Sequence, residues 1–90
     1  MKTKPFAYLI SSSGSTTDLN RTSPFSLKEL QDLVGGYIEM VPLDDGLLVV
    51  DEDGKLREKP INVGASRLLR AGYSDWVAGD AVWCSKDLVE

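Results

Sequence analysis

Residues 26–47 of the chain read SLKELQDLVGGYIEMVPLDDGL, and this stretch contains the strongest structural signals of the sequence. Ser26 and Glu29 have the spacing of a capping box, in which the serine oxygen accepts a hydrogen bond from the Glu29 amide and the glutamate bonds the amide of Ser26. Leucine and valine then recur at helical spacing and form one apolar stripe. Gly35 suits the end of a helix, because glycine adopts the left-handed conformation without steric strain. The pattern predicts a helix over residues 26–35.

A strand and a hairpin are expected directly after this helix. Residues 37–43 alternate between two faces, as a strand does, and Pro42 suits an edge strand because it has no N–H to donate. The dipeptide Asp45-Gly46 is a strong signal for a hairpin turn. The unbroken apolar run of residues 47–50 then predicts a central strand that is buried on both faces.

The remaining segments carry weaker patterns and complete the expected order. They are a strand over residues 6–11, a weaker strand over 17–22 within a polar segment (12–24) that is alternatively a mobile loop, a turn over 51–54, and a helix over 62–71 with Asn62 as its N-cap. A last strand is expected over residues 76–84, interrupted or preceded by a turn at residues 79–80. The resulting order, β-(β)-α-β-β-α-β, predicts an α+β fold with two helices and a mostly antiparallel sheet. A single domain over residues 1–90 is expected, with fraying at 1–5 and 86–90.

The composition excludes several functional classes. The chain has 90 residues, no histidine and a single cysteine, which rules out an internal disulfide and a cysteine-based zinc cluster. Because histidine is the commonest general base and metal ligand, we expect neither an enzyme nor a bound metal or cofactor. Cys84 lies in an apolar run and is expected to be a small buried side chain. No apolar run approaches the roughly 18 residues of a membrane span, and we expect a cytoplasmic protein.

Two parts of the opening stretch have the composition of ligand sites, and both have a simpler explanation. The double glycine at residues 35–36 follows a helix, whereas phosphate-binding loops place their glycines before a helix, whose N-terminal amides face the anion. The aspartates of residues 44–45 are separated from those of residues 51–53 by a predicted strand, which would hold the two groups roughly 13 Å apart. One metal ion cannot bridge that distance, so these acids are expected to be solvated turn residues.

The charges are unevenly distributed along the chain, whose net charge is −4. The acidic residues of the middle region have no basic residue among them and comprise Glu39, Asp44, Asp45, Asp51, Glu52 and Asp53. The basic residues that follow have Glu58 as their one acidic neighbour and comprise Lys55, Arg57, Lys59, Arg67 and Arg70. Such segregation either forms two solvated faces or steers a charged partner. The overall acidity argues against direct binding to nucleic acid.

Aromatic side chains gather in the C-terminal quarter of the chain. Trp83 is expected in the core. Trp76 is equally expected in the core or on the surface, where an exposed tryptophan commonly anchors an interface. Asp75 and Asp80 lie near both tryptophans in the sequence and are the best candidates for carboxyl groups with raised pKa values. No spacing rule supports them as a catalytic pair, and surface turn residues are the ordinary explanation.

The segment over residues 27–83 resembles a family of short proteins of unknown function from phages, prophages, plasmids and other mobile elements. The family pattern is of the type L-Q-x-L-V-G-G-Y-I-E-x-V-P-L, followed by an apolar strand, an acidic turn with Gly-Lys-Leu, a Pro-x-Asn stretch and a Gly-Asp turn. The matching residues are 30–31, 33–39, 41–43, 54–56, Pro60, Asn62 and 79–82. The first 25 residues depart from the family's compact start. The resemblance implies an accessory protein of a mobile element in a bacterial cytoplasm, and it implies no catalytic residues.

We therefore expect a non-enzymatic protein that binds a host or phage protein with a basic surface, with inhibition of host defence as one outcome. The residues expected to contact this partner are Asp44, Asp45, Asp51, Glu52, Asp53, Tyr73 and Trp76. The alternative is a site for a nucleotide or another anion, formed by Lys59, Asn62, Arg67 and Arg70. An edge strand could also pair with a second chain and form an oligomer.

Overall fold

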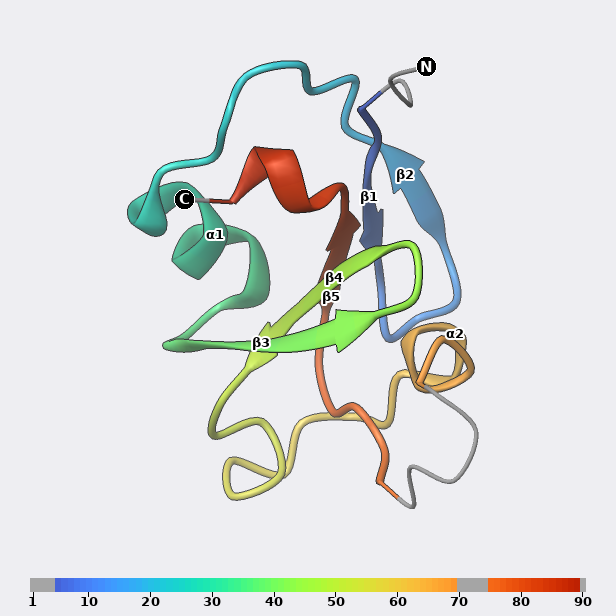
Figure 1. The fold of residues 1–90 in the computed structure, drawn as a ribbon. Coiled ribbons are helices and arrows are strands. Elements are labelled where there is room, and N and C mark those ends of the chain that lie inside the picture. Colours follow the sequence, from blue (N-terminus) through green and yellow to red (C-terminus); the bar gives the residue numbers. More distant parts are fainter. Residues whose placement is uncertain (1–4, 70–74, 90) are drawn as a thin grey trace.

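The structure, a computed structural model, describes residues 5–69 and 75–89 and contains one antiparallel sheet with the strand order β2-β1-β5-β4-β3 (Figure 1). The strands are β1 (Ala7–Ile10), β2 (Thr16–Asp18), β3 (Ile38–Leu43), β4 (Gly46–Asp51) and β5 (Ala81–Cys84). The helices are α1 (Leu27–Val34), α2 (Val63–Ser66) and the 3₁₀ helix η1 (Lys86–Leu88). The predicted α+β fold class is confirmed. None of the helices within the described residues is long and apolar enough to cross a membrane.

Helix α1 forms as its sequence predicts. The Ser26 Oγ accepts from the Glu29 amide at 3.1 Å, and the Glu29 carboxylate accepts from the Ser26 amide at 2.9 Å. The guanidinium of Arg21 also binds Glu29, and together these hydrogen bonds lower the pKa of the Glu29 carboxyl to about 2. Gly35 ends the helix in the left-handed conformation, with a φ of 80°. The capping box and the glycine stop are therefore both confirmed.

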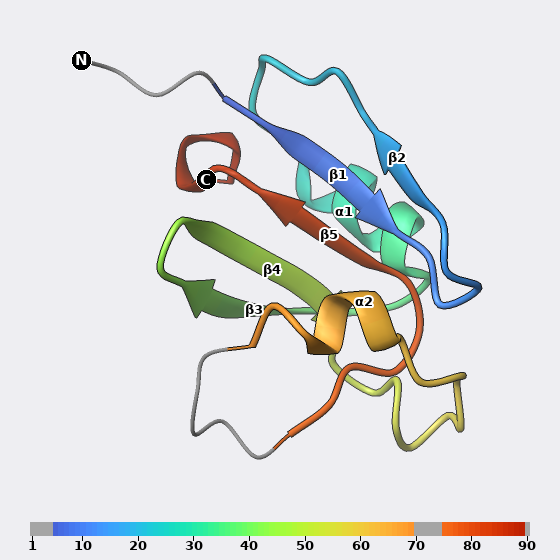
Figure 2. The ribbon, with the colours of Figure 1, turned by 90° about the vertical axis from the view of Figure 1, so that its right-hand side faces the viewer.

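Helices α1 and α2 cover opposite faces of the sheet, as Figure 2 shows. One core cluster lies between α1 and the sheet and contains Ala7, Phe25, Leu30, Val34, Val49, Val82, Cys84 and Leu88. A second cluster lies on the α2 face and contains Ile10, Val41, Leu43, Leu48, Val50, Ala65, Val77 and Ala81. Successive residues of a strand alternate between these clusters because strand side chains point to opposite faces in turn. The modest apolar content of the chain is thus divided between two thin cores.

The β3–β4 hairpin sets the free edge of the sheet. Leu43 pairs with Gly46, so Asp44 and Asp45 form the loop between the strands. Strand β4 lies between β3 and β5, and its Leu48 is fully buried, which confirms the predicted central strand. Strand β3 is one of the two edge strands of the sheet, where Pro42 needs no ladder donor.

Three of the weaker predicted elements are shorter than expected. The strand expected over residues 17–22 ends at Asp18, because Asn20 has a left-handed φ of 50°. The strand expected over residues 76–84 begins at Ala81, and the turn expected at residues 79–80 precedes it, with Gly79 at a φ of 88°. The backbone conformations of Asn20 and Gly79 therefore mark the end of β2 and the start of β5.

The helix expected over residues 62–71 also ends early, at Ser66. The next amides, of Leu68 and Leu69, bond the carbonyls three residues before them rather than four. Its N-terminus is as predicted, since the Asn62 side chain accepts from the Ala65 amide. The Ser66 hydroxyl donates to the Asn62 carbonyl and accepts from the Val77 amide, which joins this short helix to the segment before β5.

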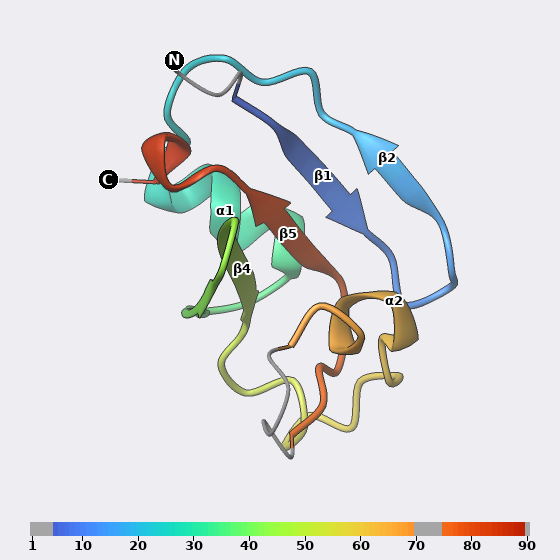
Figure 3. The same ribbon diagram turned by 45° about the vertical axis from the view of Figure 1, so that its right-hand side comes forward.

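The 3₁₀ helix η1 near the C-terminus lies beside helix α1, as Figure 3 shows. Leu88 is 2% exposed in the core beneath α1, and its carbonyl accepts from the Phe25 amide at 2.8 Å. The expectation that residues 86–90 fray is wrong for 86–89, because η1 buries Leu88 beside α1. Trp83 is half-buried and packs against Phe6 and Tyr8, with ring centroids 5.1 and 5.6 Å away.

Candidate functional site

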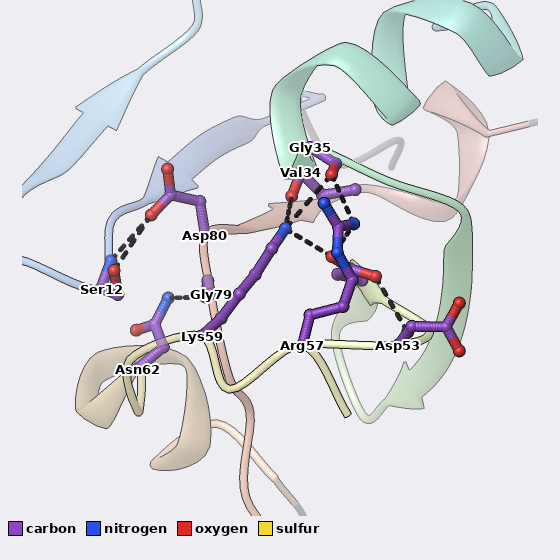
Figure 4. Close-up of polar contacts among 10 residues, drawn as sticks. Ser12, Val34, Gly35, Asp53, Arg57, Lys59, Asn62, Gly79 and Asp80 are labelled. Carbon is purple, nitrogen blue, oxygen red and sulfur yellow. Dashed lines mark hydrogen bonds and ion pairs between the residues drawn. The ribbon is translucent and has the colours of Figure 1, made fainter. Parts of the chain in front are cut away.

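A buried carboxylate lies where β4 ends beside the C-terminus of α1. The Asp51 side chain is fully buried and pairs with the ammonium group of Lys59 (Figure 4). The same ammonium donates to the carbonyls of Val34 at 3.0 Å and Gly35 at 3.3 Å. These carbonyls are among those that a helix leaves without partners at its C-terminus. Lys59 therefore joins the end of the helix to the end of the central hairpin.

Arg57 is the second cation of this cluster. Its Nη1 donates to the Gly35 carbonyl at 3.0 Å and lies 3.3 Å from Asp51 Oδ2. Cations are favourable at the C-terminus of a helix, which carries the negative end of the helix dipole. We refer to Asp51, Arg57 and Lys59, with the two helix carbonyls they contact, as the Asp51 cluster.

The Asp51 cluster holds its carboxyl in the charged form. Burial by itself raises the pKa of Asp51, but the hydrogen bond from Lys59, the one from the Asp53 amide at 2.9 Å and the charge of Arg57 outweigh it, so that the pKa lies below its usual value. The expectation that Asp51 is a solvated turn residue facing a partner is therefore wrong. The reason is that its side chain points inward, toward two cations from the following turn.

The glycines around this cluster provide the space that it occupies. A Cβ on Gly36 would lie 2.7 Å from Arg57 Nη1 and 2.9 Å from Asp51 Oδ2, closer than real Cβ contacts. A Cβ on Gly79 would lie 2.7 Å from the Cδ of Lys59. The double glycine is thus a helix end packed against an ion pair, in agreement with its assignment as a helix stop.

Asn62 is a second buried polar side chain with a structural role. Its Nδ2 donates to the carbonyls of Ile10 at 2.8 Å and Gly79 at 2.9 Å, and its Oδ1 accepts from the Ala65 amide at 3.0 Å. Both N–H donors of the amide are therefore engaged, and the residue is fully buried. Asn62 is not available to a ligand.

These contacts change the interpretation of the basic residues. Lys59 and Asn62, two of the four candidates for an anion site, are committed to the fold. Arg67 is exposed, whereas Arg70, like the candidate aromatic anchor Tyr73, lies outside the described residues. The structure thus does not bring the described members of this set together as free donors around one ligand.

The acidic candidates are likewise divided among separate places. Asp44 and Asp45 are exposed in the hairpin loop at one end of β4, and Glu52 and Asp53 follow the other end. Asp51 is the last residue of β4, next to Glu52, and its side chain is buried. The sequence prediction that the two groups of acids belong to different turns is confirmed, and a single acidic face made of all five is excluded.

The pocket beside Trp76 brings together an exposed aromatic ring and several carboxylates. Its volume is about 90 Å³, and its residues include Val41, Val50 and Val77 on the apolar side and Glu39, Glu52, Asp75, Lys55 and Trp76 on the polar side. Trp76 is 49% exposed. Of the two locations expected for this residue, the structure therefore shows the surface and not the core. We refer to this cavity and its polar residues as the Trp76 pocket.

Two carboxylates of the Trp76 pocket are unpaired within the part of the chain that the structure describes. Glu39 lies opposite Val50, two residues before Glu52, so the side chains of Glu39 and Glu52 are on the same face of the hairpin. Among residues 5–69 and 75–89, neither glutamate side chain has a hydrogen-bond or ion-pair partner, and both residues are exposed. Glu39 was not among the predicted contact residues, although the two-residue period of a strand places it with Glu52 once the hairpin register is known.

The other carboxylate of the pocket is paired with a lysine. Lys55 forms an ion pair with Asp75, and its Nζ lies 4.2 Å from the centroid of the Trp76 ring. The hydrogen bond from Lys55 and a second one from the Trp76 amide lower the pKa of Asp75. This is the direction opposite to the raised pKa that an acid catalyst at this position would need.

The chemistry of the described residues offers little else for catalysis. Asp80 is not part of the Trp76 pocket and accepts from the Ser12 amide at 3.0 Å, so Asp75 and Asp80 do not form a pair. Burial raises the pKa of the Cys84 thiol to about 11, which keeps it protonated. The part of the chain that the structure describes contains no cluster of three or more aspartate, glutamate, histidine or cysteine side chains that could hold a metal ion.

Comparison with known proteins identifies the family. Residues 5–89 match the family described as Domain of unknown function (DUF3846), and the chain therefore belongs to this family. No curated protein and no solved structure matches the chain.

Proposed function

We propose that this member of the DUF3846 family is a small non-enzymatic binding protein of a phage or other mobile element. It acts in the bacterial cytoplasm by covering a basic surface of a host protein, such as a component of host defence. The observation that supports this proposal is the Trp76 pocket, where a half-exposed indole lies beside two glutamate side chains that have no partner among the described residues.

The pocket has the features of an interface centre. Tryptophan is enriched among the residues that contribute most to binding, because a large apolar ring can be desolvated against a partner. Val41 and Val50 contribute apolar side chains to the lining of the pocket, and Glu39 and Glu52 contribute negative charge to it. Unpaired surface carboxylates near an aromatic ring favour a partner that brings lysine or arginine, and the opposite charges accelerate association.

The charge of the chain favours a protein partner over nucleic acid. The net charge is −4, and the proposed contact surface carries carboxylates that would repel phosphates. A basic protein surface, including one that itself binds nucleic acid, has the complementary charge. The chain would then act by occupying that surface.

The proposal is tested by comparing two charge reversals of equal size. Tagged wild-type protein, Glu39→Lys/Glu52→Lys and Asp44→Lys/Asp45→Lys are each used to capture proteins from a lysate of a bacterial host, with identification by mass spectrometry. We expect a basic protein to be retained by the wild type and by the variant in the hairpin loop, and lost by the variant in the Trp76 pocket.

Circular dichroism and thermal unfolding establish that both variants are folded. Equal retention by the two folded variants would reject the Trp76 pocket as the contact surface. Loss with the hairpin-loop variant alone would instead assign binding to the end of the hairpin around residues 44–45.

A further inference from the structure

A basic side chain already lies on the aromatic ring of the Trp76 pocket, and the chain itself supplies it. The Lys55 ammonium is 4.2 Å from the ring centroid of Trp76 and is paired with the Asp75 carboxylate. An ammonium at this distance over an indole is attracted by the negative face of the ring. The ring and the carboxylate therefore form a small subsite for a cation, which Lys55 occupies in this structure.

Lys55 is a replaceable occupant of this subsite. It belongs to the turn between β4 and α2, and its side chain is 41% exposed, as is 47% of the Asp75 side chain. Ion pairs exposed to this extent contribute little to stability, because water screens the charges and ordering two side chains costs entropy. Movement of the Lys55 side chain into solvent would leave the subsite open without disturbing either core cluster.

The remainder of the pocket is larger and more acidic than Lys55 requires. The cavity of about 90 Å³ exceeds by several times the roughly 10–15 Å³ that one water molecule needs. Glu39 and Glu52 line it and have no partner among the described residues. The apolar side of the pocket, formed by valines, suits the methylene stem of a long basic side chain, whose charged end would meet the carboxylates.

We infer that the Trp76 pocket is a receptor for a single arginine side chain of a basic partner protein, and that Lys55 is its internal competitor. An incoming guanidinium displaces the Lys55 ammonium from the face of Trp76 and pairs with Asp75. Arginine fits better than lysine because its planar group stacks on an aromatic ring and binds a carboxylate through two parallel hydrogen bonds. This inference rests on the proposed function and specifies the chemistry that the partner presents.

Internal competition has a measurable consequence for affinity. A ligand that binds only the open subsite has its apparent affinity reduced by the fraction of molecules in which Lys55 is displaced. Removal of the Lys55 side chain should therefore tighten the binding of an arginine-rich ligand. Because that change also makes the protein more acidic, it needs a control with the same change in charge.

Lys28 provides a matched control on another surface. It is also an exposed lysine in an ion pair with an aspartate, Asp32, at 3.4 Å on α1. The experiment measures the dissociation constant of a hexa-arginine peptide by isothermal titration calorimetry for wild type, Lys55→Ala, Lys28→Ala and Trp76→Leu. We expect about three- to tenfold tighter binding for Lys55→Ala, a change below about twofold for Lys28→Ala, and at least about fivefold weaker binding for Trp76→Leu.

The outcomes separate this inference from the proposed function. Equal affinities of Lys55→Ala and Lys28→Ala would overturn the role of Lys55 as a competitor, and equal affinities for hexa-arginine and hexa-lysine would overturn the preference for arginine. Absence of peptide binding by all variants would overturn the receptor itself. In each case, the proposed function is still supported if the wild type captures a basic host protein and the Glu39→Lys/Glu52→Lys variant does not. It is contradicted if this variant captures the host protein as well as the wild type does.

Discussion

The ammonium group of Lys59 pairs with the buried carboxylate of Asp51 and also donates to the Val34 carbonyl, so that it joins the end of strand β4 to the C-terminus of helix α1. Two glycines make the contact possible: Gly36 gives room for the carboxylate, and Gly79 gives room for the lysine stem. The residues that define the sequence motif are thus largely explained by the fold. The binding surface is expected elsewhere on the molecule, at the Trp76 pocket.

Removal of the Asp51 charge should destabilise the protein. In Asp51→Asn, Lys59 and Arg57 remain next to the helix carbonyls without their carboxylate, and loss of one partner of a buried ion pair costs about 3–5 kcal/mol. Because Lys59 is 21% exposed, we expect a loss near about 3 kcal/mol in the free energy of unfolding, measured in urea. Asp32→Asn, which removes an exposed pair, should have a much smaller effect. Equal losses in the two variants would contradict the structural role of the cluster.

The same ion pair should make the stability depend on pH in acid. The pKa of Asp51 is lower in the folded state than its ordinary value of 3.8, so the unfolded state binds a proton first as the pH falls. The contribution of Asp51 is therefore complete above about pH 5 and is lost progressively below about pH 4. We expect the free energy of unfolding to decrease between about pH 5 and pH 2 more steeply for wild type than for Asp51→Asn. Parallel curves for the two proteins would count against this explanation.

Gly36→Ala should destabilise the protein through steric contact with the Asp51 cluster. The added Cβ would lie 2.9 Å from the fixed Asp51 carboxylate, and overpacking of this kind costs about 1–3 kcal/mol. Gly64→Ala, within helix α2, is the matched control, because the nearest atom to its Cβ is a methyl carbon of Ile10 at 3.1 Å and the next is Asn62 Oδ1 at 3.8 Å. Thermal unfolding should show a larger decrease in Tm for Gly36→Ala, and the reverse order would argue that the double glycine has another role.

The sequence predicts the elements of this fold that depend on neighbours in the chain. Helix α1 has its cap, its apolar stripe and its glycine stop within ten residues, so local patterns suffice. The hairpin of β3 and β4 is similarly predictable from alternation and a turn signal. Helix α2 is shorter than predicted, and its last residue, Ser66, accepts from the distant Val77 amide, a contact that local patterns do not contain.

The candidate site depends on contacts that local patterns do not contain. Asp51 is buried because Lys59 reaches it through a space left by Gly79, and no spacing rule relates these three positions. The pocket is formed in the same way, since Lys55 in the turn after β4 pairs with Asp75, which lies 20 residues later in the chain. The sequence alone therefore indicates that acidic residues and an aromatic ring lie on the surface. It does not indicate which acidic residues line the same pocket as Trp76.

Cys84 should be unreactive in the native protein. Its side chain is fully buried and burial raises its pKa to about 11, so only about one molecule in a thousand carries a thiolate at pH 8. We expect no reaction with Ellman's reagent within minutes at pH 8, and complete reaction in a denaturant. Rapid reaction of the folded protein would show that β5 is not in the core as described.

The central claim, that the Trp76 pocket receives a basic side chain, is tested most directly by the two indole N–H signals of the ¹⁵N-labelled protein. The indole N–H of Trp83 is buried and has no acceptor within the described residues, so its signal serves as an internal reference. On titration with a hexa-arginine peptide, we predict that the indole signal of Trp76 shifts and saturates with the backbone amides of Glu39 and Glu52, while the Trp83 signal stays in place. A titration that shifts the amides of Asp44 and Asp45 and leaves the Trp76 indole unchanged would contradict the account.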